Sequence, residues 1–494
     1  MSKIQITDLT FAYPGSFENV FENVSLTLDS DWKLGLIGRN GRGKTTLLRL
    51  LLGEYSFSGQ ITAAVDFCYF PYTLPDPART ASEQLEELDG QYTEWKVIRE
   101  LNLLKADPGI LYRPFATLSG GEQAKVLLAA LFSRDNAFLL LDEPTNHLDV
   151  DARELLAAYL AKKAGYILVS HDRSLLDACT DHILSIRKTK IELCQGNFSA
   201  WYEEARRREQ SERERNEKLK GEIARLEEGA RRAAGWSAAV EKTKKGVRNA
   251  GLRPDTGYIG HKSAKMMQRA KNIEKRRLAA AEEKAGLLQD AEPEQPLKLS
   301  PLPYRSRRLA VLQDLCLFYD DRQVAGPLRL EVEQGDRICL AGSNGCGKSS
   351  VLKLLADPAA APRHTGLLEV SPGLIVSYVP QDAGFLGGDL AAYAAGRGID
   401  KSLFFTILRK FGFPRPQLEK DMAGYSGGQK KKVLLAASLC QSAHLYVWDE
   451  PLNFVDLESR IQLEELLLHY RPTLLFVEHD RVFAEKIATK TLTL

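Results

Sequence analysis

Two nonapeptides decide the fold: GRNGRGKTT at residues 38–46 and GSNGCGKSS at residues 342–350. Both fit the pattern G-x-x-x-x-G-K-[ST], in which backbone N–H groups curl around phosphate oxygens at a helix N-terminus. Each follows a strand-like run, KLGLIG or RICLAG, and opens an apolar periodic segment, TLLRLLLG or SVLKLLAD. This context predicts two loops that bind nucleotide phosphates. The alternative is a glycine-rich turn that only joins a strand to a helix.

Four motifs recur at an almost constant distance along the chain. The two loop lysines are 304 residues apart, the aspartates that end FLLLD and LYVWD are 307 apart, and the histidines of VSHDR and VEHDR are 308 apart. LSGGEQ at residues 118–123 likewise matches YSGGQK at residues 425–430. Such a period indicates a tandem duplication, with copies of about 200 residues separated by about 100.

Acidic pairs follow two buried-strand patterns, FLLLDE and LYVWDE. Mg²⁺ prefers hard oxygen ligands, so we assign Asp142 and Asp449 to the metal, together with the hydroxyls of Thr45 and Ser349. The adjacent Glu143 and Glu450 suit polarising an attacking water. The alternative is two acids on a turn. Lys44 and Lys348 should reach the β and γ phosphates.

Composition narrows the class of protein. The formal net charge of the 494 residues is only +2, and seven scattered cysteines show no zinc-site spacing. An odd cysteine count argues against a disulfide framework, so reduced thiols in the cytoplasm are expected. The first residues alternate like a strand rather than a signal peptide, and no apolar run approaches the roughly 18 to 20 residues of a membrane helix.

The central segment, from about residue 199 to residue 288, is rich in Glu, Arg and Ala, which favours helix. Leu219, Ile223 and Leu226 step by four and three toward Ala230 and Ala233, the spacing of a coiled-coil seam. Met266, Ala270 and Ile273 repeat that spacing beyond a Gly- and Pro-containing stretch. We therefore expect a long antiparallel helical hairpin.

Residues 229–277 contain fourteen Lys or Arg against three acidic residues. A charge run is usually a solvated helix face, but here acids are not interleaved, which favours a polyphosphate partner. The candidate RNA-contacting residues are Lys242, Lys244, Lys245, Val247, Arg248, Leu252, Arg253, Tyr258, His261, Lys262, Lys265 and Arg269.

With the two Ser-Gly-Gly motifs added, the sequence resembles the ATP-binding cassette superfamily over about 400 residues. The resemblance implies an α/β fold of two tandem cassettes that pair head to tail within one chain. The signature of each cassette would then close over the ATP and Mg²⁺ of the other. His171 and His479 match the switch histidine that contacts the γ-phosphate. The nucleotide-contacting set implied is Tyr13, Gly38, Asn40, Gly41, Gly43, Lys44, Thr45, Thr46, Ser119, Gly120, Gly121, Tyr319, Gly342, Asn344, Gly345, Gly347, Lys348, Ser349, Ser350, Ser426, Gly427 and Gly428.

One position departs from the family pattern. The second cassette has Gln381 at the Q-loop, a further metal ligand by resemblance, whereas the first has Tyr72 in YFPY. Tyrosine cannot mimic a glutamine amide at a metal, so the two sites are expected to differ in Mg²⁺ coordination and turnover.

Two fused cassettes, no membrane helix and a charged linker resemble the ABC-F translation factors. FAYPGSFENVFENVSL, DWKLGLIGRNGRGKTT and GYIGHKSAKMMQRAKNIEKR look like the Lsa-type antibiotic-resistance subgroup. That resemblance implies cassettes at residues 1–198 and 301–494 and a ribosome-contacting linker at residues 199–300. It also implies binding at the exit site of the 70S ribosome, where the linker meets 23S rRNA and P-site tRNA, and protection from lincosamides, pleuromutilins and streptogramin A.

Three rival functions stay open. A housekeeping ABC-F factor that relieves stalled ribosomes would share nearly every motif, although near-equal spacings from Tyr72 to Ser119 and from Gln381 to Ser426 leave no room for the arm of such members. An exporter ATPase subunit gives no reason for a basic hairpin. A DNA-repair ATPase would carry longer coiled coils or zinc modules. We therefore expect neither a DNA nor a membrane partner, and a monomer.

Overall fold

The computed structural model describes residues 2–16, 18–88, 92–145, 148–187, 189–243, 264–265, 268–273, 275–280, 298–319, 322–343, 345–357, 363–453 and 455–494. They divide into two compact units. One joins Met1–Trp201 with Pro296–Leu494 and holds both cassettes, and the other is Tyr202–Gln295. Among the described residues, no helix has the length and apolar character that a membrane crossing requires.

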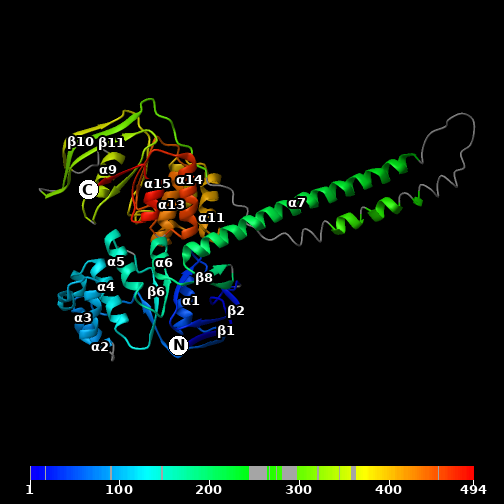
Figure 1. Cartoon of the computed structure of the whole chain (residues 1–494). Helices are drawn as coiled ribbons and strands as arrows, with labels where there is room; N and C mark the ends of the chain where they lie inside the picture. Colours follow the sequence, from blue (N-terminus) through cyan, green and yellow to red (C-terminus); the bar gives the residue numbers. More distant parts are fainter. Residues whose placement is uncertain are drawn as a thin grey trace, which may run out of the picture. The chain divides into compact units, whose positions relative to one another are not determined.

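The first cassette is built on two sheets (Figure 1). Strands β2 (Phe21–Asp29), β1 (Lys3–Phe11) and β4 (Ser58–Thr62) form a small antiparallel sheet. The larger sheet has the order β5 (Asp66–Phe70), β6 (Ala137–Asp142), β7 (Tyr166–Val169), β3 (Lys33–Ile37), β8 (His182–Arg187) and β9 (Lys190–Gln195). All its pairs are parallel except β8 with β9. The carboxyl ends of β3 and β6 carry the predicted loop and acids to one edge.

Helix α1 (Lys44–Leu51) joins these sheets in one core. Its Leu47, Leu48 and Leu50 belong to a buried cluster with residues of both sheets, which include Ile4 and Ile167. The remaining helices are α2 (Ala81–Leu88), α3 (Glu94–Leu103), η1 (Pro108–Tyr112), η2 (Phe115–Thr117), α4 (Gly120–Phe132), α5 (Val150–Leu160) and α6 (Arg173–Cys179).

The second cassette repeats the plan. Strands β11 (Arg322–Glu333), β10 (Arg308–Tyr319) and β13 (Arg363–Val370) pair antiparallel, and β14 (Val376–Val379), β15 (Leu445–Asp449), β16 (Leu474–Val477), β12 (Arg337–Ala341) and β17 (Lys490–Thr493) form a parallel sheet. Its helices are α9 (Lys348–Ala356), α10 (Leu390–Gly396), α11 (Lys401–Lys410), α12 (Arg415–Leu418), η4 (Met422–Gly424), α13 (Gly427–Cys440), α14 (Leu457–Tyr470) and α15 (Arg481–Ile487). The α/β fold with two tandem cassettes is therefore as the motifs predicted.

The central unit holds most of α7 (Phe198–Thr243), a helix of 46 residues. Residues 264–265, 268–273 and 275–280 are helical on the return side. Gly229 of α7 lies against the guanidinium of Arg277, so a segment before the basic stretch meets one after it, as in an antiparallel hairpin. Ala230 of the predicted seam is buried, but Ile273 is 44% exposed, so the seam prediction is wrong at that position. The long Arg277 side chain occupies the space beside Gly229 that a seam residue would fill.

Candidate active sites

The two glycine-rich loops adopt the same backbone where α1 and α9 begin. Gly43 and Gly347 precede these helices with φ of 98° and 92°, in the left-handed region that favours glycine. A Cβ on Gly43 would lie 2.6 Å from Cγ1 of Val20, and one on Gly347 would lie 2.8 Å from Cβ of Ala325. Each loop therefore requires glycine at this position for both conformation and space.

The loop lysines lie over their own loops and are buried. Lys44 Nζ donates to the carbonyl oxygen of Gly38 at 2.7 Å and to Oδ1 of Asn40 at 3.1 Å. Lys348 Nζ donates to the carbonyl oxygens of Gly342 and Ser343, both at 2.8 Å. Each ammonium group thus sits where the loop's N–H groups would hold phosphate. Asn344, the counterpart of Asn40, lies outside the described residues.

The acids at the ends of β6 and β15 also take equivalent positions. Glu143 and Glu450 have φ of 51° and 48°, which is rare for a residue with a side chain. Their N–H groups donate to the carbonyl oxygens of Val169 at 2.9 Å and Val477 at 3.0 Å. A residue held in this conformation costs about 1–3 kcal/mol, and such residues gather at functional sites. Both carboxylates are therefore held in place by the edge of the sheet.

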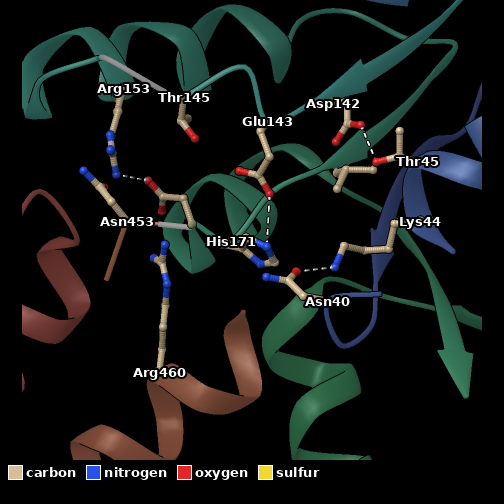
Figure 2. A pocket seen from close by; sticks show the side chains of 12 residues that line it. Asn40, Lys44, Thr45, Asp142, Glu143, Thr145, Arg153, His171, Asn453 and Arg460 are labelled. Carbon is tan, nitrogen blue, oxygen red and sulfur yellow. Dashed lines mark hydrogen bonds and ion pairs between the residues drawn. The ribbon is translucent and has the colours of Figure 1, made fainter. Parts of the chain in front are cut away.

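A cavity of about 200 Å³ surrounds the first acidic pair (Figure 2). Its lining brings together the predicted Asn40, Lys44, Thr45, Asp142, Glu143 and His171 with the unpredicted Thr145, Arg153, Val169, Asp172, Asn453 and Arg460. Asn453 and Arg460 come from the second cassette, so this cavity is built by both copies. Neither Ser-Gly-Gly turn is part of the lining.

The first site holds its glutamate as a weak acid. Burial raises the pKa of Glu143 to about 7, although the positive charges of Arg460 and Lys44 oppose the shift. His171 Nε2 lies 3.4 Å from Oε1 of Glu143, and burial with nearby positive charge places the pKa of this histidine well below its ordinary value. The imidazole of His171 is therefore neutral and lies next to the carboxyl group of Glu143.

The second site holds its glutamate as a stronger acid. Gln381 Nε2 donates to Oε1 of Glu450 at 2.9 Å, His479 Nε2 lies 3.5 Å from the same oxygen, and Asn453 donates to Oε2. Burial alone would raise the pKa of Glu450, but His479, Gln381 and Lys431 outweigh it and lower the pKa below its ordinary value. The two glutamates therefore differ because the partners of Glu450, foremost His479, outweigh burial, whereas burial prevails at Glu143. Tyr72 stands at the sequence position of the first cassette that corresponds to Gln381.

The predicted metal ligands differ between the copies as well. In the first, Oδ2 of Asp142 accepts from Thr45 Oγ1 at 2.8 Å and from the hydroxyl of Tyr69 at 3.0 Å. In the second, Asp449 is fully buried and neither carboxylate oxygen has a hydrogen-bond partner among the described residues. Burial raises the pKa of Asp449, which the nearby Ser349 hydroxyl opposes. A buried carboxylate without a partner fits a cation, so the donor set suits Mg²⁺.

The two tyrosines of the implied nucleotide-contacting set contact the loop helices. Tyr13 and Tyr319 are 42% and 47% exposed. The Tyr13 hydroxyl lies 2.7 Å from Oγ1 of Thr46, and Ser350 Oγ donates to the Tyr319 hydroxyl at 3.3 Å. Each ring therefore stays accessible to a planar base beside its own phosphate loop.

The signature serines begin α4 and α13 as helix caps. Ser119 Oγ accepts from the N–H of Glu122, and Ser426 Oγ accepts from the N–H of Gln429, both at 3.3 Å. In each case the side chain at the third position bonds back to the serine, which completes a capping box. The paired glycines occupy the first two helical positions, Gly120 with Gly121 and Gly427 with Gly428, so the first turn carries no bulky side chain.

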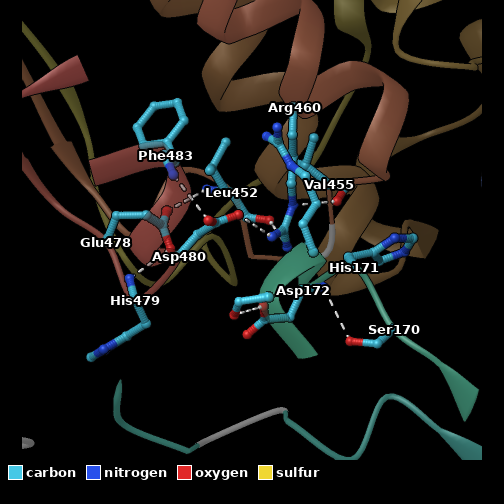
Figure 3. Close-up of polar contacts among 12 residues, drawn as sticks. Ser170, His171, Asp172, Leu452, Val455, Arg460, Glu478, His479, Asp480 and Phe483 are labelled. Atoms are coloured by element: carbon cyan, nitrogen blue, oxygen red, sulfur yellow. Dashed lines mark hydrogen bonds and ion pairs between the residues drawn. The ribbon is translucent and has the colours of Figure 1, made fainter. Parts of the chain in front are cut away.

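Some functional candidates escaped sequence reasoning. Arg460 Nη1 donates to Asp480 Oδ2 at 3.1 Å and Nε to the Val455 carbonyl at 3.0 Å (Figure 3). Arg153 likewise donates to Asp172 Oδ2 and to the Leu148 carbonyl. These arginines are 307 residues apart, so the repeat period was the signal that would have found them. They fix the turn after each acidic pair to the aspartate after each switch histidine.

Most basic linker candidates cannot be placed. Lys244, Lys245, Val247, Arg248, Leu252, Arg253, Tyr258, His261 and Lys262 lie outside the described residues, and Lys242 is described only by its helical backbone. Lys265 and Arg269 lie on helical backbone with exposed side chains.

Comparison with known proteins gives both family and relatives. The family model described as ABC transporter matches residues 21–146 and 325–453. The chain is 29% identical to the ribosome protection protein VmlR of Bacillus subtilis (strain 168), over 99% of this chain and 86% of that protein. It is 28% identical to the ATP-binding protein Uup of Caulobacter vibrioides (strain ATCC 19089 / CIP 103742 / CB 15), over 96% of this chain and 74% of that protein.

A solved structure shares the fold. The archaeal ribosome recycling factor aABCE1, in complex with the ribosomal stalk protein aP1, has a TM-score of 0.61 at 18% identity and covers 98% of this chain and 87% of its own. Two matched cassettes with complete phosphate loops and acidic pairs indicate a protein that binds and hydrolyses ATP. The chain therefore belongs to the ABC transporter family and carries two ATP-binding cassettes.

Proposed function

We propose that this ATPase binds the bacterial ribosome at the exit site, directs its linker toward P-site tRNA and the peptidyl-transferase centre, and protects the ribosome from lincosamides, pleuromutilins and streptogramin A. The observation that carries the proposal is the basic segment of residues 229–277, placed between two ATP sites in a chain whose total net charge is only +2. Unbalanced positive charge of this density favours an RNA partner. The similarity to a protein named for ribosome protection supports the same partner.

In the proposed cycle, ATP holds the cassettes together and hydrolysis lets them part. Glu143 and Glu450 orient the attacking water, while Lys44 and Lys348 neutralise charge on the phosphates. Thr45, Asp142, Ser349 and Asp449 would hold Mg²⁺, with Gln381 as an additional ligand in the second site. When bound, the metal would neutralise charge on the phosphate oxygens. His171 and His479 would contact the γ-phosphate, and reopening would release the factor from the ribosome.

Co-sedimentation tests the ribosome as the partner. The double variant Glu143→Gln with Glu450→Gln should pellet with 70S ribosomes when ATP is present and stay in the supernatant without it, because ATP can bind but is not hydrolysed. Lys44→Ala with Lys348→Ala is the matched control, since it removes the phosphate ligands and should not pellet even with ATP. If the glutamine variant does not pellet at moderate salt, the ribosome is not the partner.

The contribution of the linker to ribosome binding is measured by the salt dependence of the affinity. Replacing Lys262, Lys265 and Arg269 together by Gln should weaken ribosome binding and flatten its dependence on salt, because each lost phosphate contact lowers the slope of log affinity against log salt by roughly one. An unchanged slope would assign the basic segment to another polyanion.

Drug susceptibility separates resistance from a housekeeping role. Expression of the unmodified chain in a susceptible bacterium should raise the inhibitory concentration of a lincosamide and a pleuromutilin, and the Lys44→Ala, Lys348→Ala variant should not. Ribosome binding without any such change would favour the housekeeping ABC-F factor that relieves stalled ribosomes.

A further inference from the structure

A buried lysine joins the signature helix of the second cassette to its active site. Lys431 lies on α13 and is 3% exposed. Its Nζ donates to the carbonyl oxygens of Pro380 and Asp449, each at 2.6 Å, and of Gln381 at 3.3 Å. One ammonium group therefore fixes the Q-loop and the metal-binding strand end to the helix that Ser426 caps.

The first cassette has no such group. At the repeat period of 307 the counterpart of Lys431 is Ala124, and at 308 the counterpart of Glu478 is Ser170. The second copy thus carries both an additional buried cation and an additional buried anion. Glu478 is 7% exposed, so each of the two charges would be costly alone.

The buried carboxylate of Glu478 also binds backbone segments around the second active site. Glu478 Oε2 accepts from the N–H of Leu452 at 3.1 Å, and Oε1 accepts from the N–H of His479 at 2.8 Å (Figure 3). Burial lowers the pKa of Lys431 to about 8, and the charges of Asp449, Glu450 and Glu478 counteract that shift. The lysine and the glutamate together thus hold the four segments that surround Glu450: the Q-loop, the strand end, the following turn and the switch histidine.

We propose that Lys431 is a positioning residue for ATP hydrolysis in the second site, because it fixes Gln381 and Asp449 to α13 through their backbone carbonyl groups. The reaction at Glu450 then depends on the position of α13, whereas the first cassette has Ala124 at the position of this lysine. The proposal rests on the assignment of Glu143 and Glu450 as the water-orienting groups, and it requires no ribosome.

Lys431→Met tests the proposal in the Glu143→Gln background, where hydrolysis comes from the second site. We expect kcat to fall about 10- to 100-fold with a smaller change in KM, since small misplacements of reacting groups cost rate of this order. In the Glu450→Gln background, which leaves the first site, Lys431→Met should change kcat much less. Lys420→Met, at an exposed lysine of the same cassette, is the control for the loss of charge.

A second variant separates positioning from simple charge balance. Lys431→Met with Glu478→Gln removes both buried charges, so thermal stability should return toward that of the parent chain while kcat of the second site stays low. Lys431→Arg, which keeps a cationic donor, should restore part of kcat. Recovery of both stability and kcat in the double variant would overturn the proposal, because Lys431 would then only neutralise Glu478.

Two outcomes concern the assignment of the glutamates. An unchanged kcat for Lys431→Met in the Glu143→Gln background would also overturn the proposal. If Glu143→Gln alone abolishes all hydrolysis, the independent action of the two sites is wrong. The Lys431 variants are then compared in the unmodified chain. There the proposal requires that Lys431→Met lowers kcat and that adding Glu478→Gln does not restore it.

Discussion

At the scale of single residues, the two sites share positions but differ in acidity. Glu143 has burial as its dominant influence, and Glu450 has three polar partners that stabilise its charge. A carboxyl group must be ionised to act as a general base toward an attacking water. The copies should therefore respond differently to pH.

We expect the Glu450→Gln variant, in which only the first site works, to hydrolyse ATP faster as pH rises through about 7, the raised pKa of Glu143. Below that value the group is protonated and inactive. The Glu143→Gln variant, which relies on the lowered pKa of Glu450, should show little change between about pH 6 and 8. Initial rates measured across this range at saturating ATP check both expectations.

Gln381→Tyr, added to the Glu143→Gln variant, tests how far Gln381 lowers the pKa of Glu450. It removes the amide donor to Glu450 and gives the second site the residue found at Tyr72. The midpoint of the pH profile should then move upward. A profile that stays flat would mean that Gln381 does not set the acidity of Glu450.

At the scale of elements, the repeat lets equivalent helices be compared. Asp149 and Asp456 cap α5 and α14 through N–H groups of Ala152 and Ser459, both at 3.0 Å. Asp456 has one further role, because Lys432 Nζ lies 2.8 Å from its Oδ2 and both side chains are about 5% exposed or less. This pair holds the pKa of Asp456 well below its ordinary value.

Asp456→Asn should lower the free energy of unfolding by about 3–5 kcal/mol, because the cap survives but Lys432 is left as a buried unpaired charge. Asp149→Asn keeps the equivalent cap and should cost less than about 1 kcal/mol. Chemical denaturation of the two variants provides the comparison. Equal losses would mean that Lys432 finds another anion.

The pH dependence of stability provides a second test of the pair formed by Lys432 and Asp456. The lowered pKa of Asp456 means that its contribution is complete above the ordinary aspartate value near 3.8 and is lost as pH falls below it. The unmodified chain should thus lose stability on acidification more steeply than Asp456→Asn. Thermal unfolding followed from about pH 5 down to about pH 2 measures the difference.

The sequence predicted elements and motifs better than the contacts between them. Both loops, both acidic pairs and the strands before them lie as the patterns indicated, because glycine spacing and apolar runs encode local structure. The proposed role of Lys431 was not foreseeable, since three lysines follow one another in the signature helix and only the packing shows that Lys431 and Lys432 are buried and which groups each contacts. Arg460 reaches the first cavity from the second copy, which no local pattern can indicate.

At the scale of the unit that holds both cassettes, ion pairs join the copies, and two of these pairs differ in exposure. Arg173 binds Glu464 with both side chains less than 10% exposed, and Arg481 Nη1 lies 2.8 Å from Oε1 of Glu154 with both about 60% exposed. Charge pairs that lie close together and excluded from water couple more strongly than exposed pairs. The two contacts therefore differ in strength although both link α6 or α15 to the other cassette.

A double-mutant cycle on Arg173→Met and Glu464→Met should give a coupling energy of about 2–4 kcal/mol, and the equivalent cycle on Arg481 and Glu154 less than about 1 kcal/mol. Equilibrium unfolding of the single and double variants supplies both values. Equal couplings would mean that the buried pair finds compensating partners when broken.

The left-handed backbone of Glu143 and Glu450 lowers folding stability at positions that serve ATP hydrolysis. A glycine there would relieve a steric conflict of about 1–2 kcal/mol and would add unfolded-chain entropy of similar or smaller size. It would also remove a buried oxygen of Glu143 that has no hydrogen-bond partner among the described residues. Folding alone would therefore not retain Glu143. A lineage released from the need to hydrolyse ATP would lose this side chain early and keep an intact cassette pair.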